Sequence, residues 1–132
     1  MARRYLLACL LFAMLLSGCM LVSGEQASSD VQSGSGNISR SFVSAEGTQE
    51  ETIATGQTGT LSVIAIVSVR QGDLRIEVMD PDGSVVLSVQ GRSNEQITRS
   101  GSVPTDTEGR LRYRVIATGA RDGAYQILFQ RQ

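Results

Sequence analysis

The sequence contains no histidine and no tryptophan, and its 132 residues include only two cysteines and two prolines. Without histidine, the chain lacks the commonest metal ligand and the usual general base near neutral pH. Every Ser-His-Asp or Cys-His catalytic arrangement is thereby excluded, and so is a structural zinc site. No serine lies in the G-x-S-x-G context of a nucleophile elbow, and no spacing singles out a carboxylate pair for glycoside hydrolysis. We therefore expect no enzyme and no cofactor, with a small hydrolase as a distant alternative.

The only long apolar run lies at the beginning of the chain. Arg3 and Arg4 precede it, it extends from Tyr5 to Leu16, and small residues follow up to Cys19. Twelve residues are too few to span a membrane, which takes about 20. A positive start, a short apolar run and a small-residue cleavage site are typical of a secretory signal.

The four residues Leu16-Ser17-Gly18-Cys19 resemble the lipobox of bacterial lipoproteins. The resemblance implies cleavage after Gly18, which makes residues 1–18 the signal peptide, and a diacylglycerol on the sulfur of Cys19. Two or three acyl chains on one residue anchor a protein durably, at about 0.8 kcal/mol per buried CH₂. We therefore expect an extracytoplasmic, lipid-anchored protein. The resemblance favours the outer membrane in a cell with two, because Met20 stands where an aspartate retains lipoproteins at the inner one. A plain signal peptide that ends in a cysteine by chance is the alternative.

Removal of the signal peptide would change the cysteine content and the net charge of the chain. Cys9 leaves with it, so the mature chain keeps Cys19 alone and forms no internal disulfide. Lysine is absent, and ten arginines against thirteen acidic residues give the mature chain a net charge of −3. A nucleic-acid binder is normally basic, so no nucleic-acid partner is expected. Residues 19–37 are rich in Ser and Gly without apolar periodicity, which predicts a lipidated flexible tether.

Residues 38–132 alternate apolar and polar side chains and show no helical stripe. Turn signals separate the alternating segments, namely Gln71-Gly72, Asp80-Pro81-Asp82-Gly83, Asn94-Glu95 and Arg121-Asp122-Gly123. About eight strands follow, near 38–45, 50–54, 60–69, 73–79, 84–89, 96–101, 110–118 and 124–131. Many short strands without helices predict an all-β fold, a single antiparallel β-sandwich of jelly-roll type.

Two segments of this domain resemble a known family. Residues 72–83 are similar to the G-x-L-x-I-x-V-x-x-P-D-G hairpin of the bacterial pre-peptidase C-terminal domain, and residues 123–129 to its closing G-x-Y-x-I strand. The resemblance implies a jelly roll and a non-catalytic appendage of the kind that binds carbohydrate, protein or calcium. This chain has no enzyme domain, so a role borrowed from an attached protease does not follow.

The acidic turn offers a candidate calcium site. Asp80 and Asp82 could supply oxygen ligands, of which Ca²⁺ takes six to eight. The further carboxylates and the late glutamate of an EF-hand loop are missing. A plain turn is the favoured interpretation, and a metal site the alternative.

Arg110, Arg112 and Arg114 lie on one face of a predicted strand, with successive arginines about 6.6 Å apart. Such a row could contact an anionic headgroup, an acidic polysaccharide or a partner's carboxylates. The favoured alternative is a solvated strand face paired with acids across the sheet, such as Glu77.

Apolar residues also occur at positions that should face outward. They are Ile64, Ile66, Met79, Ile116 and Leu128. A sandwich with solvated outer faces does not need them. Either a loop or the N-terminal segment covers them, or they form a patch for a protein partner.

Taken together, these features predict an extracytoplasmic lipoprotein whose sandwich is a non-catalytic binding module of the cell envelope. Its partners would be the membrane, through the lipid, and an envelope protein or a surface polysaccharide. A structural or protective envelope lipoprotein without a discrete ligand is the alternative.

Overall fold

The computed structural model describes residues Met20–Gln132, so the predicted signal peptide and lipidation at Gly18 and Cys19 lie outside the described residues. Within Met20–Gln132 there are seven strands and no helix. Accordingly, this part of the chain offers no apolar helix of membrane-spanning length. The strands are β1 (Leu21–Ser23), β2 (Gln26–Gln32), β3 (Ser35–Ala54), β4 (Thr60–Met79), β5 (Val85–Gln90), β6 (Glu95–Pro104) and β7 (Arg110–Arg131).

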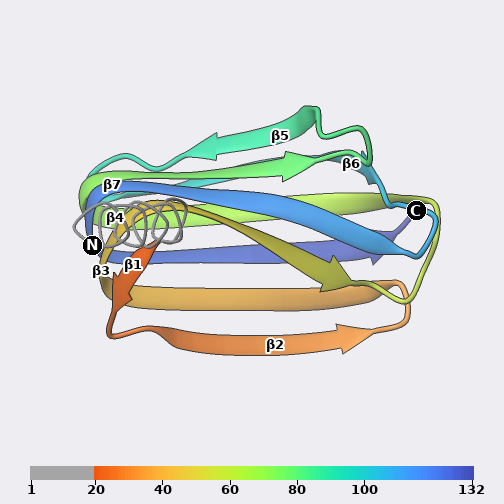
Figure 1. Ribbon diagram of the computed structural model, residues 1–132, viewed down its shortest axis with the longest axis horizontal. Helices are drawn as coiled ribbons and strands as arrows, with labels where there is room; N and C mark the ends of the chain where they lie inside the picture. Colours follow the sequence, from red (N-terminus) through yellow and green to blue (C-terminus); the bar gives the residue numbers. More distant parts are fainter. Residues whose placement is uncertain (1–19) are drawn as a thin grey trace, which may run out of the picture.

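Three long strands form the centre of the molecule. All strand pairs are antiparallel, in the order β1-β3-β7-β4-β5, while β2 pairs with β3 and β6 with β4. Strands β3, β4 and β7 each bend, so that their two halves belong to different layers (Figure 1). The first layer contains β2, residues 35–45 of β3, 120–131 of β7, 60–69 of β4, and β6. The second contains residues 47–54, 110–118 and 73–79 of the same three strands, and β5. The predicted antiparallel β-sandwich is confirmed.

Each of the eight predicted strands coincides with an observed strand or with half of a bent one. The turns predicted at Gln71-Gly72 and Arg121-Asp122-Gly123 are wrong, because the chain bends there without leaving the sheet. Gly72 has a φ of 78° and Asp122 a φ of 48°. Such left-handed residues redirect a strand while its neighbours stay paired. Strand β3 bends in the same way at a register shift next to Gly47.

The core lies between the two layers and follows the predicted alternation. Its most deeply buried side chains come from β4 and β7, with β5 and β6 adding one each; they are Leu61, Val63, Val67, Leu74, Ile76, Val78, Val89, Val103, Leu111, Tyr113, Val115 and Ile127. The rings of Tyr113 in the second layer and Tyr125 in the first meet edge to face, with centroids 5.9 Å apart. This contact shows that the two layers pack directly on each other.

The predicted flexible tether is corrected for the described residues. Leu21–Ser23 and Gln26–Gln32 are strands paired with β3, where the composition predicted a linker. All seven side chains of β2 are exposed. An edge strand of this kind is held by backbone hydrogen bonds, so its Ser-rich side chains carry no apolar pattern. Met20 and Val22 pack against the core, and the folded domain therefore begins well before residue 38.

The sandwich has two distinct ends (Figure 1). The corner end contains β1, the three strand bends and the β5–β6 connection. The loop end contains the β2–β3, β3–β4, β4–β5 and β6–β7 connections and the C-terminus. Strand β1 and the C-terminus thus lie at opposite ends of the molecule.

Candidate functional site

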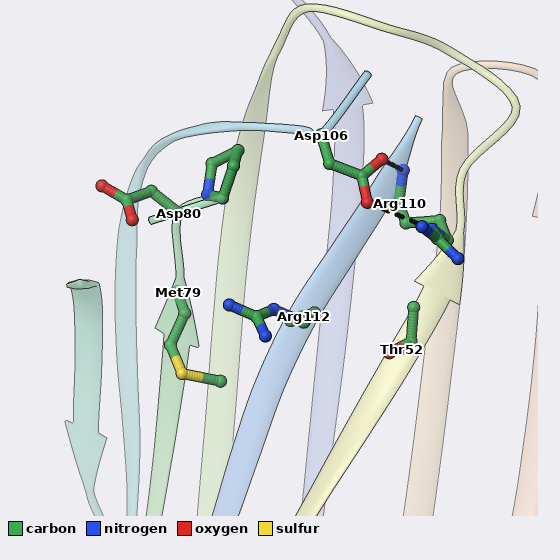
Figure 2. Close-up of a pocket in the computed structure, with 7 residues that line it drawn as sticks. Thr52, Met79, Asp80, Asp106, Arg110 and Arg112 are labelled. Carbon is green, nitrogen blue, oxygen red and sulfur yellow. Dashed lines mark hydrogen bonds and ion pairs between the residues drawn. The ribbon is translucent and has the colours of Figure 1, made fainter. Parts of the chain in front are cut away.

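A pocket of about 320 Å³ opens at the loop end. The end of β4, the turn that follows it, the β6–β7 connection and the start of β7 form its walls (Figure 2). Its lining residues are Thr52, Met79, Asp80, Pro81, Asp106, Arg110 and Arg112. Two of these are members of the arginine row that the sequence singled out.

The two aspartates hold the walls of the pocket in place. Asp80 Oδ1 accepts hydrogen bonds from the backbone N–H groups of Asp82, at 3.0 Å, and Ser84, at 2.9 Å. Asp106 Oδ1 accepts the corresponding bonds from Glu108, at 2.8 Å, and Arg110, at 2.9 Å. The Arg110 backbone bond, with help from the Glu108 amide and the Arg110 guanidinium, holds the pKa of Asp106 below its ordinary value. Both turns are therefore fixed by their own carboxylates.

These bonds bear on the calcium candidate. Asp80 and Asp82 form the predicted turn, and one oxygen of Asp80 already accepts two backbone hydrogen bonds. Between Met20 and Gln132 no group of three or more Asp, Glu, Cys or His residues is arranged to hold a metal ion. A Ca²⁺ at this turn would have to take most of its oxygens from water.

The three arginines of the row differ in their partners. Arg110 Nε lies 3.1 Å from Asp106 Oδ2, and Arg110 Nη2 lies 3.0 Å from Glu108 Oε2. Arg112 forms no ion pair within the described part of the chain. Its guanidinium lies between Met79 and β7, at the floor of the pocket (Figure 2).

Arg114 lies farther along the same face. Its guanidinium contacts Glu50 Oε1 at 2.9 Å and Glu77 Oε1 at 3.3 Å. It has the cross-strand acids that the solvated-face interpretation expected, including Glu77. Arg112 is thus the member of the row whose guanidinium is available to an incoming anion.

The five outward apolar residues do not form one surface. Ile64, Ile66 and Leu128 belong to the first layer, and Ile64 lies directly opposite Leu128. Met79 and Ile116 belong to the second layer, where Met79 is only 2% exposed beneath the Arg114 guanidinium. A single patch of all five is therefore wrong. The bends cause the split, because each long strand crosses from one layer to the other between these positions.

Sequence reasoning missed a polar cluster that joins the two layers of the sandwich. Arg40 Nη1 lies 3.0 Å from Glu25 Oε1 and 3.6 Å from Glu51 Oε1. Next to it, the hydroxyls of Tyr113 and Tyr125 are 3.3 Å apart. Burial raises the pKa of both tyrosines, so the pair stays protonated over the physiological range.

A signal for this cluster was present in the sequence. Arg40 lies between Ile38 and Phe42, both of which face the core. Its parity therefore places it among inward residues, where a charge requires a partner. The partner Glu25 lay in the segment interpreted as a tether, and the cluster was missed for that reason.

Comparison with known proteins gives structural similarities only. No family model matches the chain, and no curated protein matches it. A carbohydrate-binding module from Cellvibrio mixtus lichenase 5A, solved with cellotriose, is 14% identical and covers 85% of this chain and 90% of its own, with a TM-score of 0.43. TmCBM61, solved with β-1,4-galactotriose, is 17% identical over 84% and 90%, with a TM-score of 0.46. The CBM22-1 xylan-binding domain of Paenibacillus barcinonensis Xyn10C is 12% identical over 87% and 85%, with a TM-score of 0.42. Similarities this weak assign no ligand to the chain.

Proposed function

We propose that this protein is a lipoprotein, anchored through Cys19 to the outer face of a membrane, whose β-sandwich is a non-catalytic module that binds an acidic surface polysaccharide. The order of Arg3-Arg4, the apolar run and Leu16-Ser17-Gly18-Cys19 supports the anchor. The guanidinium of Arg112, without an ion pair among the described residues and at the floor of a polar pocket, supports the binding site.

The chemistry of the pocket favours a carboxylated sugar. A guanidinium presents parallel N–H donors that match a carboxylate in a bidentate arrangement. Pro81 adds apolar surface, against which the C–H face of a sugar ring can pack. The volume of about 320 Å³ is at the lower limit of small-molecule sites. One uronic acid unit therefore fits this pocket better than a large ligand does.

The binding proposal is tested with one variant and one matched control. Arg112→Gln removes the guanidinium that has no ion pair among the described residues. The control Arg99→Gln removes an equal charge from an exposed arginine whose guanidinium, within residues 20–132, bonds only to the adjacent Thr98 carbonyl. Calorimetric titration with an oligouronate should show about a tenfold or greater loss of affinity for Arg112→Gln, because charge-assisted hydrogen bonds contribute about 1.5–3 kcal/mol. The control should bind like the wild type. Equal binding of an uncharged oligosaccharide, or no binding of the oligouronate, would contradict the proposal.

The anchor is tested separately. We expect mass spectrometry of the mature protein to find Cys19 as the first residue, with a diacylglycerol on its sulfur. Cys19→Ala should abolish lipidation and release the protein from the membrane fraction. A mature chain that starts elsewhere would refute the anchor and leave the pocket unaffected.

A protein partner is the second candidate, supported by the outer face of the first layer. Ile64 is 40% exposed there, and Leu128 lies beside it on β7. Apolar side chains on a solvated face favour contact with another protein. Crosslinking in intact cells through Ile64 would identify such a partner.

A further inference from the structure

The first described strand leaves almost no spacer before the residue proposed to carry the lipid. Leu21, Val22 and Ser23 pair with Glu46, Ala45 and Ser44 of β3. Cys19 stands two residues before Leu21 in the sequence, and two residues of chain span at most about 7 Å. A lipid on Cys19 would therefore be attached directly at the corner end.

The corner end also presents apolar side chains to solvent. Leu21 is 75% exposed and Val43 55%, the two highest values among the large exposed hydrophobic residues of the described chain. Val43 directly precedes the segment of β3 that pairs with β1, and its side chain occupies the space that a Cβ at Gly24 would take. The two side chains therefore belong to one corner, next to the proposed acyl chains.

A polar group suited to lipid headgroups lies beside Leu21. A hollow of about 320 Å³ is lined by β1, the bend of β3 and the bend of β7, and Arg121 is one of its walls. Glu46 also lines this hollow, and its carboxylate accepts a hydrogen bond from the Gly119 amide. Arg121 is exposed and forms no ion pair with any residue from Met20 to Gln132. Its guanidinium is available to a phosphate.

The net charge of the corner end is small. Arg70 lies 3.6 Å from Asp122. Asp73 and Glu95 offset the charges of two further arginines at this end, Arg92 and Arg121. Attraction to anionic lipids is therefore a minor contribution. Apolar contact and the adjacent lipid would hold this end against a zwitterionic bilayer as well.

We propose that the corner end rests on the bilayer surface, with Leu21 and Val43 inserted at the boundary between headgroups and acyl chains and Arg121 at the level of the phosphates. This docking rests on the proposed lipid anchor. Its consequence is a fixed orientation, because the loop-end pocket lies at the opposite end of the sandwich (Figure 1). The strand half Thr60–Val69 has ten residues and is roughly 30 Å long, so the pocket would face away from the membrane by about that distance.

The absence of tryptophan from the chain makes a direct test possible. Leu21→Trp, Val43→Trp and Val86→Trp each introduce a single fluorophore at an exposed position, the last on β5 away from the corner. The full lipidated protein is reconstituted in phosphatidylcholine vesicles with and without brominated acyl chains. Fluorescence at positions 21 and 43 should fall by roughly half or more with brominated lipid, since insertion reaches about 5–10 Å into the interface. Position 86 should remain unquenched.

A second measurement separates docking from anchoring. A ten-residue Gly/Ser insert between Met20 and Leu21 keeps the lipid and should reduce quenching of Leu21→Trp. Lipidated variants whose residues 21 and 43 stay unquenched would overturn the docking and leave the anchor intact. Mass spectrometry that finds Cys19 unmodified would overturn the anchor, and the docking with it. Quenching at 21, 43 and 86 alike would overturn the proposed orientation.

Discussion

At the scale of single residues, the clearest energetic case is the buried tyrosine pair. Within Met20–Gln132, each of the two hydroxyls has the other as its hydrogen-bond partner, and both rings are almost fully buried. A hydroxyl that loses its partner in such a place has no water to replace it. The cost of an unsatisfied buried group, about 1–3 kcal/mol, therefore exceeds the net value of the bond itself.

This asymmetry predicts the outcome of a double-mutant cycle. We expect Tyr113→Phe and Tyr125→Phe each to lower the free energy of unfolding by about 1–2 kcal/mol, measured by urea denaturation. The double variant should cost less than the sum of the two by roughly 1 kcal/mol, because no orphaned hydroxyl remains. Strict additivity would show that water or another group already satisfies each hydroxyl.

Asp106 gives a pH-dependent prediction. Its pKa is lowered, so protonation is harder in the folded state than in the unfolded chain. The stabilisation is present above the ordinary value of 3.8 and disappears as pH falls through the lower folded pKa. We expect Asp106→Asn to have a lower Tm than wild type at pH 7, and this difference to shrink below pH 3.8. A difference in Tm that is constant with pH would contradict the assignment.

At the scale of the element, the bends of the long strands depend on a close backbone approach. Gly72 has a φ of 78°, and a Cβ there would collide with the carbonyl oxygen of Gly119. Gly119 has a φ of 55°, but a Cβ there would meet no atom within 4 Å. The two positions share left-handed backbone and differ in available space.

This difference predicts unequal costs for the same substitution. Gly119→Ala should cost about 1–2 kcal/mol, the strain of a left-handed residue with a side chain. Gly72→Ala should cost a further 1–3 kcal/mol or so, because the two bends must move apart. Thermal unfolding of both variants measures the difference. Equal Tm values would mean that the bend relaxes without cost.

Strand β4 carries apolar residues on both faces, and the structure separates their roles. Val63 is fully buried between the layers, whereas Ile64 is 40% exposed. We expect Ile64→Asp to remain folded, with a loss of stability under about 1 kcal/mol, and Val63→Asp to prevent folding because its charge has no partner in the core. Circular dichroism distinguishes the two. Unfolding of Ile64→Asp would favour a covered face over a partner surface.

The alternation of apolar and polar residues was sufficient to locate the strands. It did not show which of them are continuous with each other. Leu74, Ile76 and Val78 are buried as predicted, since period two reflects one buried face. The glycines at positions 72 and 123 indicated turns, yet the same residues serve in bends of continuous strands. A glycine in a turn and a glycine in a strand bend have the same local sequence signature. Only the pairing with neighbouring strands, which is not a local property, decides between them.

The candidate site was predictable in part for the same reason. The arginine row was visible from its spacing, but ion pairing depends on acids from distant elements. Glu50 and Glu77, which form ion pairs with Arg114, lie 64 and 37 residues away from it in sequence. Arg112 has no ion pair among the described residues because of its position in the tertiary structure, and this could not be derived from the sequence.

At the scale of the whole molecule, the N-terminal strands contribute unequally. Strand β1 brings Met20 and Val22 against the core, whereas every side chain of β2 is exposed. Apolar burial contributes about 25 cal/mol per Å², so most of the stability that this region adds comes from β1 and the residue before it. The lipid would then be attached to a part of the chain that belongs to the fold.

This distribution predicts how N-terminal truncation affects stability. A soluble fragment that begins at residue 26 should unfold about 10 °C below one that begins at residue 20, because loss of the two half-buried side chains costs about 2 kcal/mol. A fragment that begins at residue 33, which lacks β2 but keeps all of β3, should lose little more, since β2 adds only edge hydrogen bonds, each with a small net value. Calorimetric Tm values of the three fragments test this order. If the fragment from residue 26 were as stable as the one from residue 20, residues 20–25 would be a tether. The proposed docking of the corner end on a membrane would then lose its physical basis.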